Sequence, residues 1–177
     1  MLPEPYLRVP HVRANLVQGA AGVFVDSNGS SRGISNRTDL VRLLDLRKLA
    51  DVVVTDGETA RKEGYRVPKT SDLAVITAAG YSPKSTDSNH KYIELRLNPG
   101  AAIQRLLDEG YTRILLELGP NLVAALVDDG MIDELCLTNS QGSTPDLHKL
   151  GIYSAELVFD EVAEDTRFSI WNQIRSL

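Results

Sequence analysis

The chain has 177 residues, with 24 acidic and 19 basic side chains and a formal net charge of −5, so we expect one domain over residues 1–177. The acidic balance argues against a nucleic-acid-binding protein, and no apolar run approaches the ~20 residues of a membrane span. One cysteine and three separated histidines exclude a disulfide framework and predict no metal site. The N-terminus lacks the features of a signal peptide, so we expect a cytoplasmic protein that contacts neither nucleic acid nor a membrane.

The first half of the chain is predicted to alternate between buried strands and helices. A helix is expected over Arg37–Ala50, with Asn36 placed to cap it, and one or two helical turns over Glu58–Gly64. The residues of the first helix at three- and four-residue spacing are Leu40, Leu43, Leu44 and Arg47. A short strand is predicted at His11–Val17, and short apolar runs predict buried strands at Asp51–Thr55 and Leu73–Thr77.

The second half continues this alternation and then turns to strands alone. Asn98 and Pro99 suit the start of a helix that Gly110 ends, and a further helix is predicted from Pro120 through Asp129. The predicted strands are Arg113–Leu118, Ile132–Thr138 and a hairpin of Glu156–Val162 and Arg167–Ile174, with its turn at Glu164 and Asp165.

The order of these elements predicts an α/β fold. Strand and helix alternate through about residue 138, which is typical of a parallel sheet that helices cover on both faces. We therefore expect a three-layer α/β/α domain with a mostly parallel central sheet and an antiparallel C-terminal hairpin.

The turn Leu118-Gly119-Pro120-Asn121 is a candidate ligand site between a buried strand and a helix. Its glycine lets a ligand approach the backbone, and the N–H groups at the helix N-terminus can bind an anion such as a cofactor phosphate. The alternative is a plain strand-to-helix turn with Pro120 at the first helical position.

The segment Thr55-Asp56-Gly57-Glu58-Thr59 is a second candidate, because ligands of α/β sheets bind outside the carboxyl ends of strands. Thr59 can donate a hydrogen bond to a phosphate, whereas the two carboxylates would repel one. The alternative is a helix start in which Thr55 or Asp56 caps the first turn.

Three further features remain open at this point. Asn15 is a polar residue inside a core strand, so it faces either a ligand or a neighbouring loop. A basic cluster of Arg61, Lys62 and Arg66 either binds a substrate phosphate or forms a solvated helix face. Cys136 is expected to be a small buried hydrophobe.

Four segments in this order resemble the riboflavin-biosynthesis pyrimidine reductase family, that is, the 5-amino-6-(5-phosphoribosylamino)uracil reductase domain. They are VRANLVQ followed by Gly22, GISNRTDLVRLLDLRKLADVVV, GETARKEGY and LELGPNLVAALVDDGMIDELCLT, and they span Val12 to about Thr138. The resemblance implies a dihydrofolate-reductase-like fold and a small-molecule substrate. It also implies that NADPH serves to reduce the ribose of a phosphoribosylamino-pyrimidine to a ribityl chain.

The resemblance also implies roles for single residues. Asn15 matches an asparagine at the substrate and nicotinamide site, so it is the candidate catalytic residue. Together with Arg61 it is also expected to bind substrate. The expected cofactor-binding residues are Gly57, Thr59 near the phosphates, Thr77 at the adenosine ribose and its 2′-phosphate, and Glu117, Gly119, Pro120 and Asn121 around the pyrophosphate. Asp133, Glu134 and Leu135 match a structural Asp-Glu-Leu motif.

Three ligand-facing signatures depart from the family pattern. Ser-x-Asp-Gly reads Gly19-Ala20-Ala21-Gly22, the glycines of Gly-x-Gly-Thr fall on Asp56 and Glu58, and the first glycine of Glu-Gly-Gly-Pro falls on Leu118. Two alternatives therefore stay open: a non-catalytic relative that has lost cofactor binding, and a pterin-type reductase. We expect Asp56 and Glu58 to turn outward as helix caps, which leaves the cofactor site usable.

The resemblance finally implies a homodimer. Phe168, Ile170 and Trp171 place large apolar groups near the C-terminus. The last two strands are therefore predicted to supply part of the interface.

Overall fold

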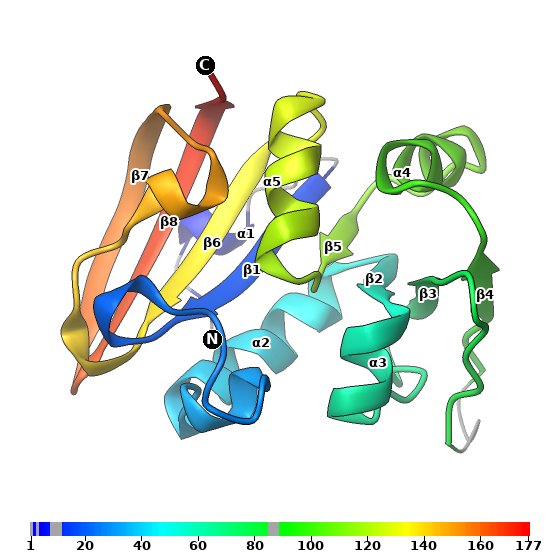
Figure 1. The fold of residues 1–177 in the computed structure, drawn as a ribbon, viewed down its shortest axis with the longest axis horizontal. Helices are drawn as coiled ribbons and strands as arrows, with labels where there is room; N and C mark the ends of the chain where they lie inside the picture. The colour runs from blue at the N-terminus through cyan, green and yellow to red at the C-terminus, as the bar shows by residue number, and fades with distance from the viewer. Residues whose placement is uncertain (1, 3, 8–11, 85–88) are drawn as a thin grey trace.

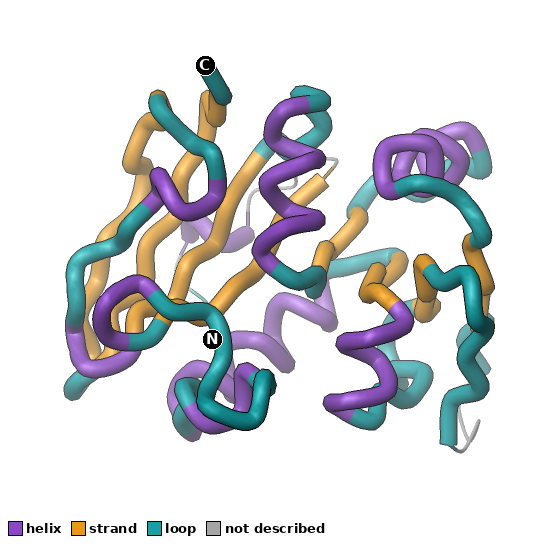
Figure 2. The backbone as a smooth tube through the Cα atoms, in the orientation of Figure 1, coloured by secondary structure: helices purple, strands orange, loops and turns teal. Residues whose placement is uncertain are grey.

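The fold is built on one eight-stranded sheet, which Figure 1 shows as arrows and Figure 2 as orange tube. The computed structural model describes residues 2, 4–7, 12–84 and 89–177. The strand order across the sheet is β4-β3-β2-β5-β1-β6-β8-β7. The strands are β1 (Val12–Gln18), β2 (Val52–Asp56), β3 (Asp72–Ile76), β4 (Tyr92–Leu95), β5 (Ile114–Leu116), β6 (Glu134–Asn139), β7 (Ser154–Ala163) and β8 (Thr166–Arg175).

Strand directions confirm the predicted fold class. The six strands from β4 to β6 are parallel to their neighbours, whereas β8 runs antiparallel to β6 and β7 runs antiparallel to β8. The β-branched run of β2 lies between β3 and β5, and Val52, Val53 and Val54 are all fully buried. A run that is apolar on both faces therefore does mark an interior strand of a covered sheet.

Helices cover both faces of the sheet. They are α1 (Glu4–Leu7), α2 (Arg37–Leu49), α3 (Gly57–Glu63), α4 (Pro99–Asp108) and α5 (Pro120–Asp128). Figure 1 shows α5 in front of β1 and β6, with α2 behind the sheet. Within the described residues, none of the helices is long and apolar enough to cross a membrane.

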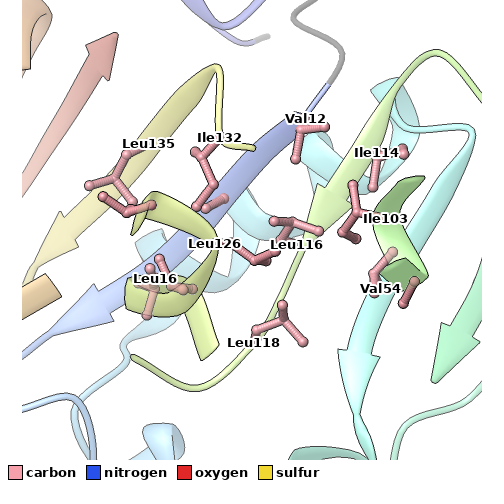
Figure 3. Close-up of a cluster of buried hydrophobic side chains, with 14 of the residues drawn as sticks. Val12, Leu16, Val54, Ile103, Ile114, Leu116, Leu118, Leu126, Ile132 and Leu135 are labelled. Atoms are coloured by element: carbon pink, nitrogen blue, oxygen red, sulfur yellow. The ribbon is translucent and has the colours of Figure 1, made fainter. Parts of the chain in front are cut away.

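Two separate apolar cores hold the three layers together. The α5-face core packs residues of α4 and α5, such as Ile103 and Leu126, against Val54 and Leu116 of the sheet (Figure 3). The α2-face core packs Leu46 of α2 and Ala60 of α3 against the opposite side of the same strands. Because successive strand residues point to opposite faces, each short central strand contributes to both cores.

Capping residues set the helix starts where the sequence predicts them. The Asn36 side chain accepts a hydrogen bond from the backbone N–H of Asp39, and the Asn98 side chain accepts one from Ala101. Each bond satisfies a backbone donor that the first turn of a helix leaves open. The starts predicted for α2 and α4 are therefore confirmed.

The buried side of α2 differs from the predicted leucine stripe. Leu40 and Leu44 are 51% and 45% exposed, while Asp39 is 6% exposed and Arg42 and Arg47 are half-buried. Spacing alone made the leucines a plausible inner stripe. The helix instead turns charged groups towards the sheet, because the sheet offers them ionic and hydrogen-bonding partners.

Three other expectations need correction. Strand β4 was not predicted, because it is a four-residue edge strand interrupted by the polar Glu94. Strand β5 covers three residues instead of the six expected over Arg113–Leu118. Phe168 and Ile170 are buried within the chain itself, so these two side chains cannot supply the predicted interface, whereas Trp171 is partly exposed and the interface on the last two strands stays a prediction. His11, the predicted first residue of β1, lies outside the described residues.

Candidate functional site

The connections after β5 and its two neighbours make one edge of the sheet the candidate ligand site. The chain leaves β1 and β2 towards α2 and α3 on the α2 face, whereas it leaves β5 towards α5 on the opposite face. In open α/β sheets, ligands bind outside the carboxyl ends of strands where neighbouring connections diverge in this way. The carboxyl end of β5, with the turn that follows it, is therefore the expected place for a ligand, and we call this edge of the sheet the crevice.

The N-terminus of α5 is open at this crevice. Gly119 is its N-cap residue, and no side chain caps the helix. A Cβ atom added to Gly119 would meet nothing within 4 Å, so the space beside this backbone is free. Pro120 occupies the first turn and Asn121 is exposed. The turn therefore presents helix-terminal N–H groups to an approaching anion.

Leu118 does not block that approach. Its side chain is 4% exposed and packs into the α5-face core, as Figure 3 shows. The departure from the family glycine at this position therefore fills the core and leaves the open side of the turn at Gly119 unchanged.

The N-terminus of α3 is satisfied from within the chain. The Asp56 carboxylate accepts hydrogen bonds from the backbone N–H groups of Glu58 and Thr59, at 2.9 Å each. The Thr59 hydroxyl donates to the same carboxylate at 2.7 Å, and Glu58 points outward to pair with Lys62. The helix-cap interpretation is thus confirmed, and Asp56 itself is the anion at this helix terminus.

Three of the predicted site residues meet at the ends of β2 and β3. A Cβ atom on Gly57 would lie 2.4 Å from the Thr77 hydroxyl oxygen and 3.1 Å from Nη1 of Arg61, so only glycine fits there. The Arg61 guanidinium donates to the carbonyl oxygen of Gly80 at 3.2 Å. Gly57, Thr77 and Arg61 therefore form one basic corner of the crevice, which we call the Arg61 corner.

Asn15 belongs to a different part of the crevice. It lies on the α2 face of β1, in register with Cys136 of β6 on one side and next to Glu117, just past β5, on the other. The Asn15 side chain is half-buried and has no hydrogen-bond partner within the described part of the chain. Strands β2 and β5 separate it from β3, so Asn15 and the Arg61 corner are roughly 14 Å apart at ~4.8 Å per strand.

Glu117 is held by a charge network that the sequence analysis missed. Arg47 of α2 binds its carboxylate through Nε at 2.7 Å and Nη2 at 2.6 Å, and the Tyr65 hydroxyl donates to Oε2 at 2.5 Å. Burial lowers the pKa of Arg47, but the Glu117 charge outweighs it and the pKa is raised overall. Burial, followed by the same charge, holds the pKa of Tyr65 well above its usual range.

This network shows what the Glu117 carboxylate contacts within the chain, and the predicted role of Glu117 at the pyrophosphate stays a prediction. Its side chain points to the α2 face, beside Asn15, while the turn predicted to bind the pyrophosphate begins two residues later at Gly119. Arg47 gave one signal in the sequence, as the basic residue among the leucines of α2. Tyr65 gave none, because it lies in the irregular segment after α3.

Cys136 is a buried thiol on β6. Burial raises the pKa of the Cys136 thiol, which is 2% exposed, so the expectation of a small buried hydrophobe is confirmed. In the part of the chain that the structure describes, no group of three or more metal-ligating side chains comes together.

Comparison with known proteins shows the family to which the chain belongs. The family model described as the RibD C-terminal domain matches residues 10–140 of the chain. The chain belongs to the RibD C-terminal domain family. This is a family of reductases of riboflavin biosynthesis, as the sequence resemblance implied.

Solved structures share the fold at low sequence identity. A pyrimidine reductase-like protein from Corynebacterium diphtheriae is 19% identical, with a TM-score of 0.71 over 98% of this chain and 95% of that one. The riboflavin biosynthesis reductase of Saccharomyces cerevisiae is 11% identical, with a TM-score of 0.57 over 97% and 92%.

A bifunctional relative shows how the domain occurs elsewhere. The diaminohydroxyphosphoribosylaminopyrimidine deaminase/5-amino-6-(5-phosphoribosylamino)uracil reductase of Thermotoga maritima is 12% identical, with a TM-score of 0.67. The match covers 93% of this chain and 56% of the Thermotoga chain. No curated protein sequence matches this chain.

The Arg47–Glu117 pair yields a test of the network. Replacing Glu117 by alanine leaves a partly buried guanidinium without its partner, so we expect a loss of about 3–5 kcal/mol in the free energy of unfolding. The variant with both residues replaced should lose at least about 1 kcal/mol less than the sum of the single losses. Urea unfolding of wild type, the two single alanine variants and the double variant measures this coupling. The exposed Lys62–Glu58 pair is the control, with an expected coupling below about 0.5 kcal/mol; equal coupling in both pairs would contradict the assignment.

Proposed function

We propose that this chain is an NADPH-dependent reductase of a phosphoribosylamino-pyrimidine or a related heterocycle. The observation that carries the proposal is the open N-terminus of α5 at Gly119, in the crevice where the connections after β5 and its neighbours diverge. A dinucleotide pyrophosphate is the anion that such a turn suits best in an α/β reductase.

The residues on either side of that turn fit the rest of a dinucleotide. The Gly119-Pro120-Asn121 turn would hold the pyrophosphate, and the Arg61 corner would hold the adenosine ribose with its 2′-phosphate. Asn15, whose amide has no partner among the described residues, would orient the reacting rings at the opposite end. A bound nicotinamide supplies a hydride, so the chain's own task is to position substrate and exclude water.

One observation favours the alternative of a non-catalytic relative. Asp56 places a carboxylate on the backbone donors of α3, a terminus that could otherwise share in binding a phosphate. Saturable NADPH binding by the wild-type chain decides between the two. Its absence would favour the relative that has lost cofactor binding.

Gly119→Val tests the open turn. The φ of −62° suits any residue, and a Cβ meets no neighbour, so we expect folding to be unaffected. The added side chain stands where the phosphate would approach, so NADPH affinity should fall by at least tenfold, about 1.4 kcal/mol. Fluorescence titration with NADPH measures this. Ala125→Val, on the exposed face of the same helix, should bind like wild type. Unchanged affinity in Gly119→Val would place the pyrophosphate elsewhere.

Arg61→Met tests the preference for the 2′-phosphate. The exposed guanidinium beside Thr77 is suited to a phosphate dianion, and methionine keeps the apolar stem without the charge. We expect NADPH affinity to fall by about tenfold and NADH affinity to change by less than twofold, because NADH lacks that phosphate. The same fluorescence titrations compare the two cofactors. An equal loss for both would mean that Arg61 does not contact the 2′-phosphate.

We also propose a homodimer, with the outer face of α2 as its contact surface. Leu40, Val41 and Leu44 are 51%, 54% and 45% exposed and form an apolar stripe on this helix. Exposed apolar residues that cluster in this way mark interaction surfaces, and a twofold axis would bring two such stripes together.

Val41→Glu tests this surface by placing a charge in the centre of the stripe. We expect wild type to sediment as a dimer at micromolar concentration and this variant as a monomer, because the charge would be buried without a partner. Val162→Glu on β7, where valine is 60% exposed, is the matched control and should remain dimeric. A wild-type monomer, or a dimer broken only by Val162→Glu, would refute the proposed surface.

A further inference from the structure

The connection between β6 and β7 borders an open cavity on the α5 face of the sheet. Its volume is about 660 Å³, which is in the range of small-molecule sites. Trp171 of β8 and Ser154 and Ala155 of β7 line it from the sheet, and residues 144–148 and 152–153 of the connection line the rest. In Figure 1 the short helical turn of this connection, drawn in orange, lies in front of β8. We call this space the Trp171 cavity.

The Trp171 cavity is distinct from the crevice. Trp171 is in register with Leu135, four residues before β6 ends at Asn139, which is about 13 Å from the carboxyl end of that strand at ~3.3 Å per residue. In addition, β8 lies three strands from β5, or roughly 14 Å at ~4.8 Å per strand. A ligand in this cavity would therefore not occupy the place proposed for NADPH beside Gly119.

Two buried amides fix the backbone that borders the cavity. The Gln18 side chain donates a hydrogen bond to the carbonyl oxygen of Asp146 at 3.1 Å and accepts one from its backbone N–H at 2.9 Å. Asn139 donates to the same Gln18 oxygen at 2.9 Å, and both amide residues are fully buried. Because these bonds hold the backbone of Asp146, this wall of the cavity is formed before any ligand binds.

The Asp146 carboxylate has no partner among the described residues. Asp146 precedes the 3₁₀ turn Leu147–Leu150, but its side chain accepts no hydrogen bond from that turn. An ionised carboxylate can only accept hydrogen bonds, so a ligand with N–H donors would satisfy it. No lysine or arginine is found among the described residues that line the cavity. A phosphate or a carboxylate ligand would therefore be repelled.

Ring side chains supply a second kind of contact. The indole N–H of Trp171 already donates to the Ser169 hydroxyl at 2.9 Å, so Trp171 offers the cavity its ring and no free donor. The rings of His148 and Tyr153 lie 5.2 Å apart, and Tyr153 is 53% exposed, which leaves its ring open to a ligand. Aromatic side chains of this kind stack on flat rings.

We propose that the Trp171 cavity binds an uncharged, flat nitrogen heterocycle that carries a ring N–H beside an amino group, as guanine does. The two neighbouring donors would bind the two oxygens of the Asp146 carboxylate, while the ring stacks on the Trp171 indole. The hydroxyls of Thr144 and Ser154 can both donate and accept, so they suit the other polar atoms of such a ring or of an attached sugar. A quaternary organic cation makes no hydrogen bonds and would leave these hydroxyls unused.

Guanosine is the probe for this site, and Trp171 reports on it directly because it is the only tryptophan of the chain. We expect guanosine to change the tryptophan emission of the wild-type chain saturably, with half-saturation below about 1 mM. Inosine lacks the amino group and adenosine lacks the ring N–H, so each should require at least about tenfold more. The absence of a saturable change with guanosine, or an equal response to inosine, would overturn the proposal.

Asp146→Asn tests the contact with the carboxylate. The backbone bonds to Gln18 remain and the side chain has no partner to lose, so the melting temperature should stay within about 2 °C of wild type. Half-saturation by guanosine should rise at least about tenfold and the difference from inosine should disappear, because an amide offers one acceptor and one set of donors. Asp108→Asn, on the exposed side of α4, is the matched control and should bind like wild type. A preference for guanosine that survives in Asp146→Asn would contradict the assignment.

Two competitors test the ligand class and the location. Excess tetramethylammonium should not displace guanosine, and displacement would assign the cavity to organic cations instead. Excess NADP⁺ should leave the half-saturation for guanosine within about twofold, since the two ligands occupy different places. Competition by NADP⁺ would place guanosine in the crevice and overturn the Trp171 cavity as its site. A chain that binds guanosine but no NADPH would overturn the proposed function and leave this inference standing.

Discussion

Burying a carboxylate at the end of β5 is the constraint on which this side of the molecule depends. Glu117 has little access to water, so its charge must be matched by protein donors. Arg47 supplies two of them from α2 and Tyr65 supplies one from the segment after α3. One carboxylate thus fixes how α2 lies on the sheet and where the chain passes after α3. This requirement also turns the charged side of α2 inward and leaves its leucines facing out.

The layers on the two faces of the sheet differ in polarity as a result. The α5 face is an apolar contact in which residues of α4 and α5 pack on the sheet. The α2 face combines an apolar core with a polar row that includes Thr55, Glu117 and Asn15 at the level of the strand ends. Stability comes mainly from burial of apolar surface on both faces. Ligand chemistry can be built on the α2 face because that layer already holds ordered polar groups next to the crevice.

Hydrophobic pattern and helix caps were sufficient to predict most of the fold. The three central strands are apolar on both faces, and Asn36, Asn98 and the glycines after the helices mark element ends by local chemistry that needs no tertiary information. The orientation of α2 could not be predicted in this way. Its leucines have helical spacing, and only the partners on β5 and β6 decide that Asp39 and Arg47 are the residues that face the sheet. The edge strand β4 was missed because four residues give too little pattern.

The candidate site likewise has features that local sequence predicts and features that depend on tertiary contacts. Turn chemistry located Gly119 and identified Asp56 as a helix cap, since both depend on neighbours in sequence. The contacts of Glu117 with Arg47 and Tyr65 bring together residues 70 and 52 positions apart in the chain. The burial of Asp39 likewise depends on a sheet that closes over α2. Apart from Arg47 among the leucines of α2, these contacts leave no mark in the sequence, because they arise from the way the layers close over each other.

The Asp56 carboxylate on α3 has a consequence for the thermodynamics of binding at the crevice. Because this helix terminus carries its own anion, the first turn of α3 is wound and hydrogen-bonded before any ligand arrives. Chains whose glycine-rich loops become ordered only on a bound phosphate spend part of the interaction energy on lost backbone freedom. In this chain the backbone of the first turn of α3 already becomes ordered during folding. Association at this end of the crevice should therefore have a small entropy penalty and should leave the backbone of α3 nearly unchanged.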